Sequence, residues 1–63
     1  MHKTARQRYV LDILSEQGQA SIAELAEKLQ VSADTIRRDL TDLENQGLAQ
    51  KNHGGALRST SPP

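Results

Sequence analysis

Two adjacent arginines, Arg37 and Arg38, carry the most specific binding chemistry in this chain. The planar guanidinium group can hold the O6 and N7 atoms of guanine in the DNA major groove, and it can also grip a phosphate. We expect one arginine to read a base and the other to hold the backbone, and the residues leave the order open. An arginine pair on a helix is more often a solvated face, so the elements around the pair decide its meaning.

The residues next to this pair form a polar face at helical spacing. If Ile36 faces the interior, steps of about 100° per residue turn a polar face outward. The residues on that face and its flanks are Ala33, Asp34, Arg37, Arg38 and Thr41. Ser32, at the start of the helix, offers its hydroxyl and nearby backbone N–H groups to a phosphate. Thr35 lies on the flank, where it serves as a phosphate contact or as a local cap.

A second group of candidate contacts follows the helix. Lys51 is most simply a phosphate contact and otherwise a solvated charge on a strand. His53 can donate to a phosphate, although a role in the turn itself is the more common one. Gly54 and Gly55 are expected to supply the positive φ values of a short hairpin, and their lack of side chains would allow close approach to DNA.

Stop and start signals predict three helices that would position these residues. The first helix is expected over residues 4–17, with Thr4 as its cap and Gly18 as its left-handed end. A short connector follows, with at most one β-bridge. Ser21 begins the second helix, and Glu24, three residues later, completes a capping box.

The third helix is expected over residues 33–46. Gln30 and Val31 form the turn before it, Ser32 caps it, and Gly47 ends it. A strand, a glycine turn and a second strand are then expected over residues 48–58. The predicted core consists of Val10, Ile13, Leu14, Ile22, Leu25, Ala26, Leu29, Val31, Ile36, Leu40, Leu43, Leu48 and Leu57.

Together these elements predict a mostly α fold with a small β wing, a three-helix winged helix-turn-helix. The domain is expected over residues 1–58, with the helix-turn-helix at about 21–46 and the wing at about 48–58. Residues 59–63, rich in serine and proline, are expected to link it to a further domain.

Composition bounds the function. The chain has 8 basic and 8 acidic residues, so its net charge of zero predicts modest non-specific affinity for DNA. Lys3 and Arg6 at the amino end are possible phosphate contacts. Asp39 is expected to be structural, paired with Arg6, with Arg8 or with a backbone donor.

The absence of cysteine and the presence of only two histidines argue against a closed zinc site, and no cofactor is expected. The absence of a long apolar run predicts a soluble, cytoplasmic domain.

The motif at residues 32–40, Ser-Ala-Asp-Thr-Ile-Arg-Arg-Asp-Leu, resembles the amino-terminal domain of DeoR-type bacterial transcriptional regulators. The segment from Lys51 to Ala56 resembles the His-Gly-Gly-Ala wing of that family, and the likeness covers about residues 2–58. Gln30 departs from the glycine or asparagine common in the family's turn. The resemblance implies a repressor of a sugar or nucleoside metabolism operon that binds double-stranded operator DNA. It also implies that the full-length protein is a homo-oligomer, with a phosphorylated sugar bound to its carboxy-terminal domain.

Two other classes of function compete with DNA binding. A winged helix can serve as a protein-interaction module, which the neutral charge favours, but this requires a sizeable exposed apolar patch. An enzyme is disfavoured because the sequence offers no nucleophile–base pair, no metal ligand set and no phosphate loop before a helix. A domain of this size is also too small to enclose an ordinary pocket.

Overall fold

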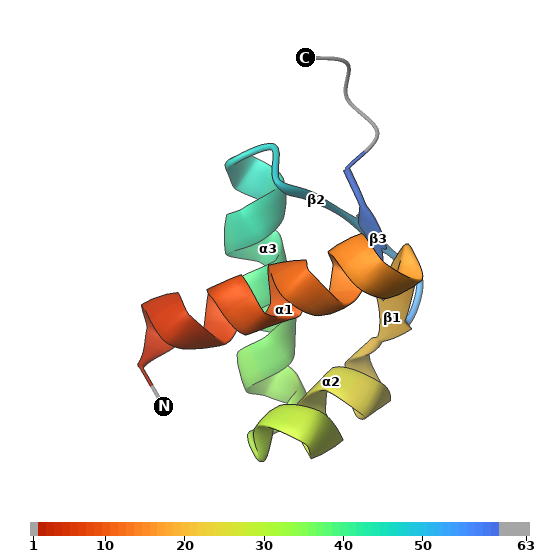
Figure 1. The fold of residues 1–63 in the computed structure, drawn as a ribbon. Helices are drawn as coiled ribbons and strands as arrows, with labels where there is room; N and C mark the ends of the chain where they lie inside the picture. Colours follow the sequence, from red (N-terminus) through yellow and green to blue (C-terminus); the bar gives the residue numbers. More distant parts are fainter. Residues whose placement is uncertain (1, 60–63) are drawn as a thin grey trace.

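The computed structural model describes residues 2–59 and confirms a winged helix-turn-helix, mostly helical with a small sheet (Figure 1). The elements are α1 Lys3–Gln17, β1 Gln19–Ser21, α2 Ile22–Leu29, α3 Ala33–Asn45, β2 Ala49–Asn52 and β3 Gly55–Arg58. Of the predicted linker, residues 60–63 lie outside the described part. No helix within residues 2–59 is both long and apolar enough to cross a membrane.

The three strands form one antiparallel sheet in the order β1-β3-β2. The connector after α1 is therefore a strand of its own, longer than the single bridge that the sequence suggests. Two backbone hydrogen bonds tie the β2–β3 hairpin, which is the wing, to the helices. The N–H of Ile22 donates to the carbonyl of Gly54 at 2.9 Å, and the N–H of Arg58 donates to the carbonyl of Gly18 at 2.9 Å. The wing is thus fastened at both ends.

The helix caps are mostly those expected from the sequence. The Ser21 hydroxyl accepts from the N–H of Glu24, and the Ser32 hydroxyl accepts from the N–H of Thr35. Gly18 ends α1 in the left-handed region, with φ at 84°. The expected cap at Thr4 is wrong, because α1 begins one residue earlier and Thr4 lies inside it.

The turn between α2 and α3 places Gln30 in the left-handed region, with φ at 58°. Non-glycine residues rarely adopt this conformation. The Gln30 side chain donates to the carbonyl of Glu27 at 2.7 Å, and its backbone N–H donates to the same carbonyl. These bonds partly satisfy the end of α2, so glutamine stands here without altering the fold.

The core lies between the three helices and the inner face of the sheet. The buried apolar residues are Val10, Ile13, Leu14, Ala20, Leu25, Leu29, Ile36, Leu40, Leu43, Ala49 and Ala56. Three alanines in this set, one on each strand, were not expected from the sequence. Their small side chains allow the sheet to lie close against the helices.

Five predicted core residues are less buried than expected. Leu48 is 45% exposed, because it precedes β2 rather than lying within it. The other four are partly buried: Ile22, Ala26, Val31 and Leu57. Ile22, Ala26 and Val31 still pack against the core, and Leu57 lies on the central strand β3.

The two glycines of the wing have different roles, which corrects the expectation that both supply positive φ. Gly54 adopts φ of 86°, whereas Gly55 is not in the left-handed region. A Cβ at Gly55 would lie 2.3 Å from the carbonyl oxygen of Ala20. Glycine is needed at position 55 because β1 and β3 approach too closely for any side chain.

Candidate nucleic-acid interface

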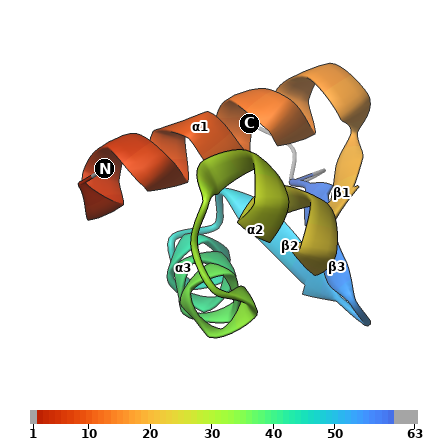
Figure 2. The same cartoon turned by 90° about the horizontal axis from the view of Figure 1, so that it is seen from below.

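Helix α3 presents a polar face opposite its buried side. Ile36 and Leu40 are fully buried, whereas the side chains of Asp34 and Arg37 are 80% and 53% exposed. Arg38 is also exposed. In Figure 2, α1 lies along one side of the molecule, while α3 and the tip of the wing both lie on the other. Helix α3 and the tip of the wing thus lie on the same side of the molecule.

The two arginines of α3 differ in their surroundings. Arg37 donates to the carboxylate of Asp34 at 2.6 Å, an i,i+3 ion pair. Within residues 2–59, Arg38 has no hydrogen-bond or ion-pair partner. Arg38 can thus accept a ligand without breaking an internal bond, whereas Arg37 must first leave Asp34.

The amino end of α3 is capped by side chains of its first residues. The Ser32 hydroxyl accepts from the N–H of Thr35 at 3.2 Å and lies 3.0 Å from the Thr35 hydroxyl. Thr35 therefore takes part in local capping, one of the two roles expected for it. Both hydroxyl groups belong to α3 at the end where its dipole is positive, next to Ala33.

The wing and α3 are joined through Lys51. Its ammonium group donates to the Thr41 hydroxyl at 3.0 Å, and its backbone N–H donates to the carboxylate of Glu44 at 3.1 Å. The Thr41 hydroxyl in turn donates to the carbonyl of Arg37 at 3.0 Å. A cation of the wing and an arginine of α3 thus border one continuous surface.

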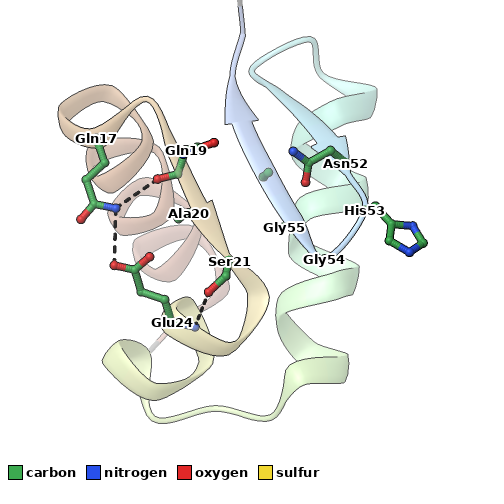
Figure 3. A pocket seen from close by; sticks show the side chains of 10 residues that line it. Gln17, Gln19, Ala20, Ser21, Glu24, Asn52, His53, Gly54 and Gly55 are labelled. Atoms are coloured by element: carbon green, nitrogen blue, oxygen red, sulfur yellow. Dashed lines mark hydrogen bonds between the residues drawn. The ribbon is translucent and has the colours of Figure 1, made fainter.

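The tip of the wing is exposed at His53 and Gly54. In Figure 3 the His53 ring points away from the strands. Within residues 2–59 no group of three or more histidine, cysteine or acidic side chains could hold a metal ion.

The amino end of α1 reaches the opposite edge of the same face. Lys3 forms an ion pair with Asp42 at 2.7 Å, and this hydrogen bond lowers the pKa of the Asp42 carboxyl below its usual value. Lys3 and Asp42 line a shallow depression of about 380 Å³ together with Arg37, Arg38 and Thr41. Lys3, expected as a phosphate contact, therefore lies beside the arginines.

Arg6, the other cation of α1 considered as a phosphate contact, is held inside the molecule. Its Nε and one terminal nitrogen donate to the two carboxylate oxygens of Asp39. Of the three partners considered for Asp39, the structure thus selects Arg6. The sequence reasoning missed Gln7, whose amide lies 3.4 Å from oxygens of both Asp39 and Asp42. The signal was present in the spacing, since positions 3, 6 and 7 share one face of a helix.

A second depression, of about 440 Å³, lies between the wing turn and the start of α2 (Figure 3). Gln17 donates to the carbonyl of Gln19 and to the carboxylate of Glu24 along its wall. Bonds to Lys28 first, and then to Gln17 and the backbone of Ser21, lower the pKa of Glu24. The side chains of Gln17 and Glu24 on this wall are thus engaged with each other.

Comparison with known proteins agrees with this geometry. Residues 6–62 match the model of the DeoR-like helix-turn-helix domain. An L-fucose operon activator of Haemophilus influenzae is 46% identical over 52 residues, covering 82% of this chain and 21% of that protein. The glycerol-3-phosphate regulon repressor of Escherichia coli is 41% identical over 61 residues, covering 97% of this chain and 24% of that protein.

A third relative is the lactose phosphotransferase system repressor of Streptococcus mutans, 39% identical over 56 residues, covering 89% of this chain and 22% of that protein. The chain thus spans less than a quarter of the length of these relatives. No solved structure matches the chain significantly. The match to the family model, the relatives and the winged fold agree: this chain belongs to the DeoR-like helix-turn-helix family of DNA-binding domains in transcriptional regulators.

Proposed function

We propose that this domain reads one half-site of an operator, with α3 in the major groove and the wing on the flanking backbone or minor groove. The observation that carries this is the continuous surface from Arg38 through Arg37 and Thr41 to Lys51. Helices of this motif enter the major groove with their outward side chains against base edges. The wing cation is then in place to contact a phosphate.

We assign the base-reading role to Arg38 and the backbone role to Arg37. Steps of about 100° per residue from the buried Ile36 put Arg38 near the centre of the outer face and Arg37 on the flank. The contacts of Thr41 and Glu44 with Lys51 show that this flank faces the wing. Arg38 also has no partner to give up within the described residues.

Further contacts complete the proposed interface. Asp34 and Ala33 lie on the outer face beside the arginines, and Ser32 and Thr35 present hydroxyls at its edge. The proposed phosphate contacts are Ser32, Thr35, Lys51, His53, Gly54 and Lys3. Gly55, expected at the interface from the sequence, is buried against β1 and is not among them. Arg6 is left out of this group, because Asp39 holds its guanidinium.

The similarity to full-length relatives extends the proposal to the whole protein. The relatives are named as an L-fucose operon activator, a glycerol-3-phosphate regulon repressor and a lactose phosphotransferase system repressor. We propose a cytoplasmic, non-enzymatic regulator of a sugar or nucleoside metabolism operon that represses by occupying its operator. A homo-oligomer would supply the second half-site, and a phosphorylated sugar would act through a further domain that residues 59–63 join to this one.

Selection from a pool of random duplex DNA tests this proposal. The chain is incubated with the pool at two salt concentrations, alone and fused to a dimerising coiled coil, and bound DNA is sequenced. We expect an enriched motif whose affinity falls as salt rises, because phosphate contacts release counterions. No enrichment by the dimeric fusion, at either salt concentration, would contradict the proposal and favour a protein-interaction module.

A further inference from the structure

The two halves of α1 contact the rest of the molecule in different ways. The buried residues of α1 are Val10, at its midpoint, and Ile13 and Leu14, in its carboxy-terminal half. The amino-terminal half contributes no buried apolar side chain. It meets α3 through the polar side chains of Lys3 and Arg6 and of Gln7.

The partner of these side chains is the DNA-facing helix itself. Asp39 is 1% exposed, and it is the only buried polar or charged residue within residues 2–59. The Arg6 side chain that covers it is 14% exposed. Arg6 donates two hydrogen bonds to the two oxygens of Asp39, and Gln7 lies 3.4 Å from one of them.

This bidentate pair is more directional than the apolar contacts of α3, and it is buried, whereas the Lys3–Asp42 pair beside it is exposed. Apolar contacts such as those of Ile36 and Leu40 depend on the area buried and tolerate small rotations of a helix. A bidentate arginine–carboxylate pair adds geometric specificity, because both donors must align with both acceptors. Asp39 directly follows Arg37 and Arg38 on α3, so its orientation fixes where the two arginines point.

A buried ion pair also contributes little to stability on balance. The cost of removing both charges from water largely offsets their attraction, and apolar replacements are often neutral or stabilising. The pair is therefore better suited to setting the rotation of α3 than to holding the fold together. Functional groups generally need placement within about 0.5 Å and 10–20°. Apolar contacts, which have no preferred direction, do not guarantee such placement.

We propose that Arg6, through Asp39, is a positioning residue for sequence reading: it fixes the rotation of α3 so that Arg38 meets its base. Arg6 itself makes no contact with DNA in this arrangement. The inference rests on the proposed placement of α3 in the major groove.

The test replaces the whole pair while keeping the net charge. The double variant Arg6→Met with Asp39→Val removes one positive and one negative charge and leaves no unpaired charge, and the Gln7 amide keeps Asp42 as a partner. The specificity ratio, which is the affinity for the selected duplex divided by that for a scrambled duplex, is measured with the dimeric fusion. Thermal unfolding by circular dichroism is measured in parallel.

We expect a cooperative melt near that of the parent chain and an affinity for the scrambled duplex changed by less than about twofold. The affinity for the selected duplex should fall about tenfold, the size of one lost base contact. A folded double variant that keeps the parent specificity ratio would overturn the inference, because the pair would then be structural only.

Two further variants keep the test decisive. Arg6→Lys retains the charge but not the planar fork. It should fold and lose several-fold in the specificity ratio, and an unchanged ratio in this variant overturns the inference even if the double variant does not fold. The control, Lys28→Met with Glu24→Gln, removes the exposed ion pair of α2 and should leave the ratio unchanged. If the parent chain shows no selectivity, the DNA-reading proposal itself fails, and the inference falls with it.

Discussion

Helix α3 and the wing form one surface, but they are fixed to the domain by different means. Helix α3 is held by side chains, namely three fully buried apolar residues and the pair of Asp39 with Arg6. The wing is held by its backbone, through Ile22 and Gly54 and through the close approach at Gly55. The difference indicates that α3 can vary its outer side chains freely, whereas the wing depends on glycine at position 55 for its close approach to β1.

The largest expected effect comes from a substitution that disrupts the side-chain packing of α3. Ile36→Asp places an unpaired charge at a fully buried position. Such a change costs more than about 4 kcal/mol, comparable to the whole stability expected for a small domain. We expect no cooperative thermal transition by circular dichroism. Arg38→Ala, on the exposed side of the same helix, should melt like the parent, and a cooperative melt of Ile36→Asp would contradict the orientation of α3.

The matching change in the wing is Gly55→Ala. Its Cβ would lie 2.3 Å from the carbonyl oxygen of Ala20, and backbone atoms on both strands must move to relieve the contact. Overpacking of this kind typically costs about 1–3 kcal/mol. We expect a melting temperature lower by about 4–8 °C for each kcal/mol lost. Gln50→Ala, an exposed change on β2, is the control, and equal melting temperatures for the two variants would refute a backbone-held wing.

Arg38→Ala tests whether the outer face of α3 reads DNA bases. We expect the variant to fold normally and to lose about 1–3 kcal/mol of binding to the selected duplex, with relaxed preference at one base position. Repeating the selection with this variant measures both effects. Arg37→Ala is the paired measurement: an even loss across sequences fits a phosphate contact, and loss of preference by Arg37→Ala alone would reverse the two assignments.

The smallest expected effect concerns the wing cation. Lys51→Ala should weaken binding to all duplexes to a similar degree, because a phosphate contact carries no sequence information. The slope of the logarithm of affinity against the logarithm of salt concentration should become shallower by about 1. Titrations at several salt concentrations measure this slope. Lys28→Ala on α2 is the control, and an unchanged slope for Lys51→Ala would remove the wing lysine from the interface.

Much of the helical part could be predicted from the residues. The serine caps at Ser21 and Ser32, the left-handed end at Gly18 and the inward spacing of Ile36 and Leu40 were all found in the structure. These features are local, since a cap involves residues three apart and a helical face repeats every three to four residues. The one misplaced cap, Thr4, lies two residues from the observed N-cap, His2. This error is within the usual uncertainty of one or two residues at a helix end.

The sheet was less predictable because its contacts join distant parts of the chain. Nothing near Ala20 or Ala56 in the sequence indicates that the two residues pair and become buried. Leu48, by contrast, looks like a core residue by its type but precedes the strand and is exposed. A short strand carries little periodicity, so its register depends on its partners.

By itself, the sequence determined the helices, the caps at Ser21 and Ser32, the outward arginines and the likeness to the DeoR-type family. Only the tertiary structure decided that Arg6 pairs with Asp39, that Lys3 lies beside Arg38, and that Gly55 is required by the approach of β1. The physical reason is the separation along the chain of the residues that interact. Helix formation and capping are decided within a few residues, whereas the partner of a charge or the space around a glycine depends on which distant segments pack against it.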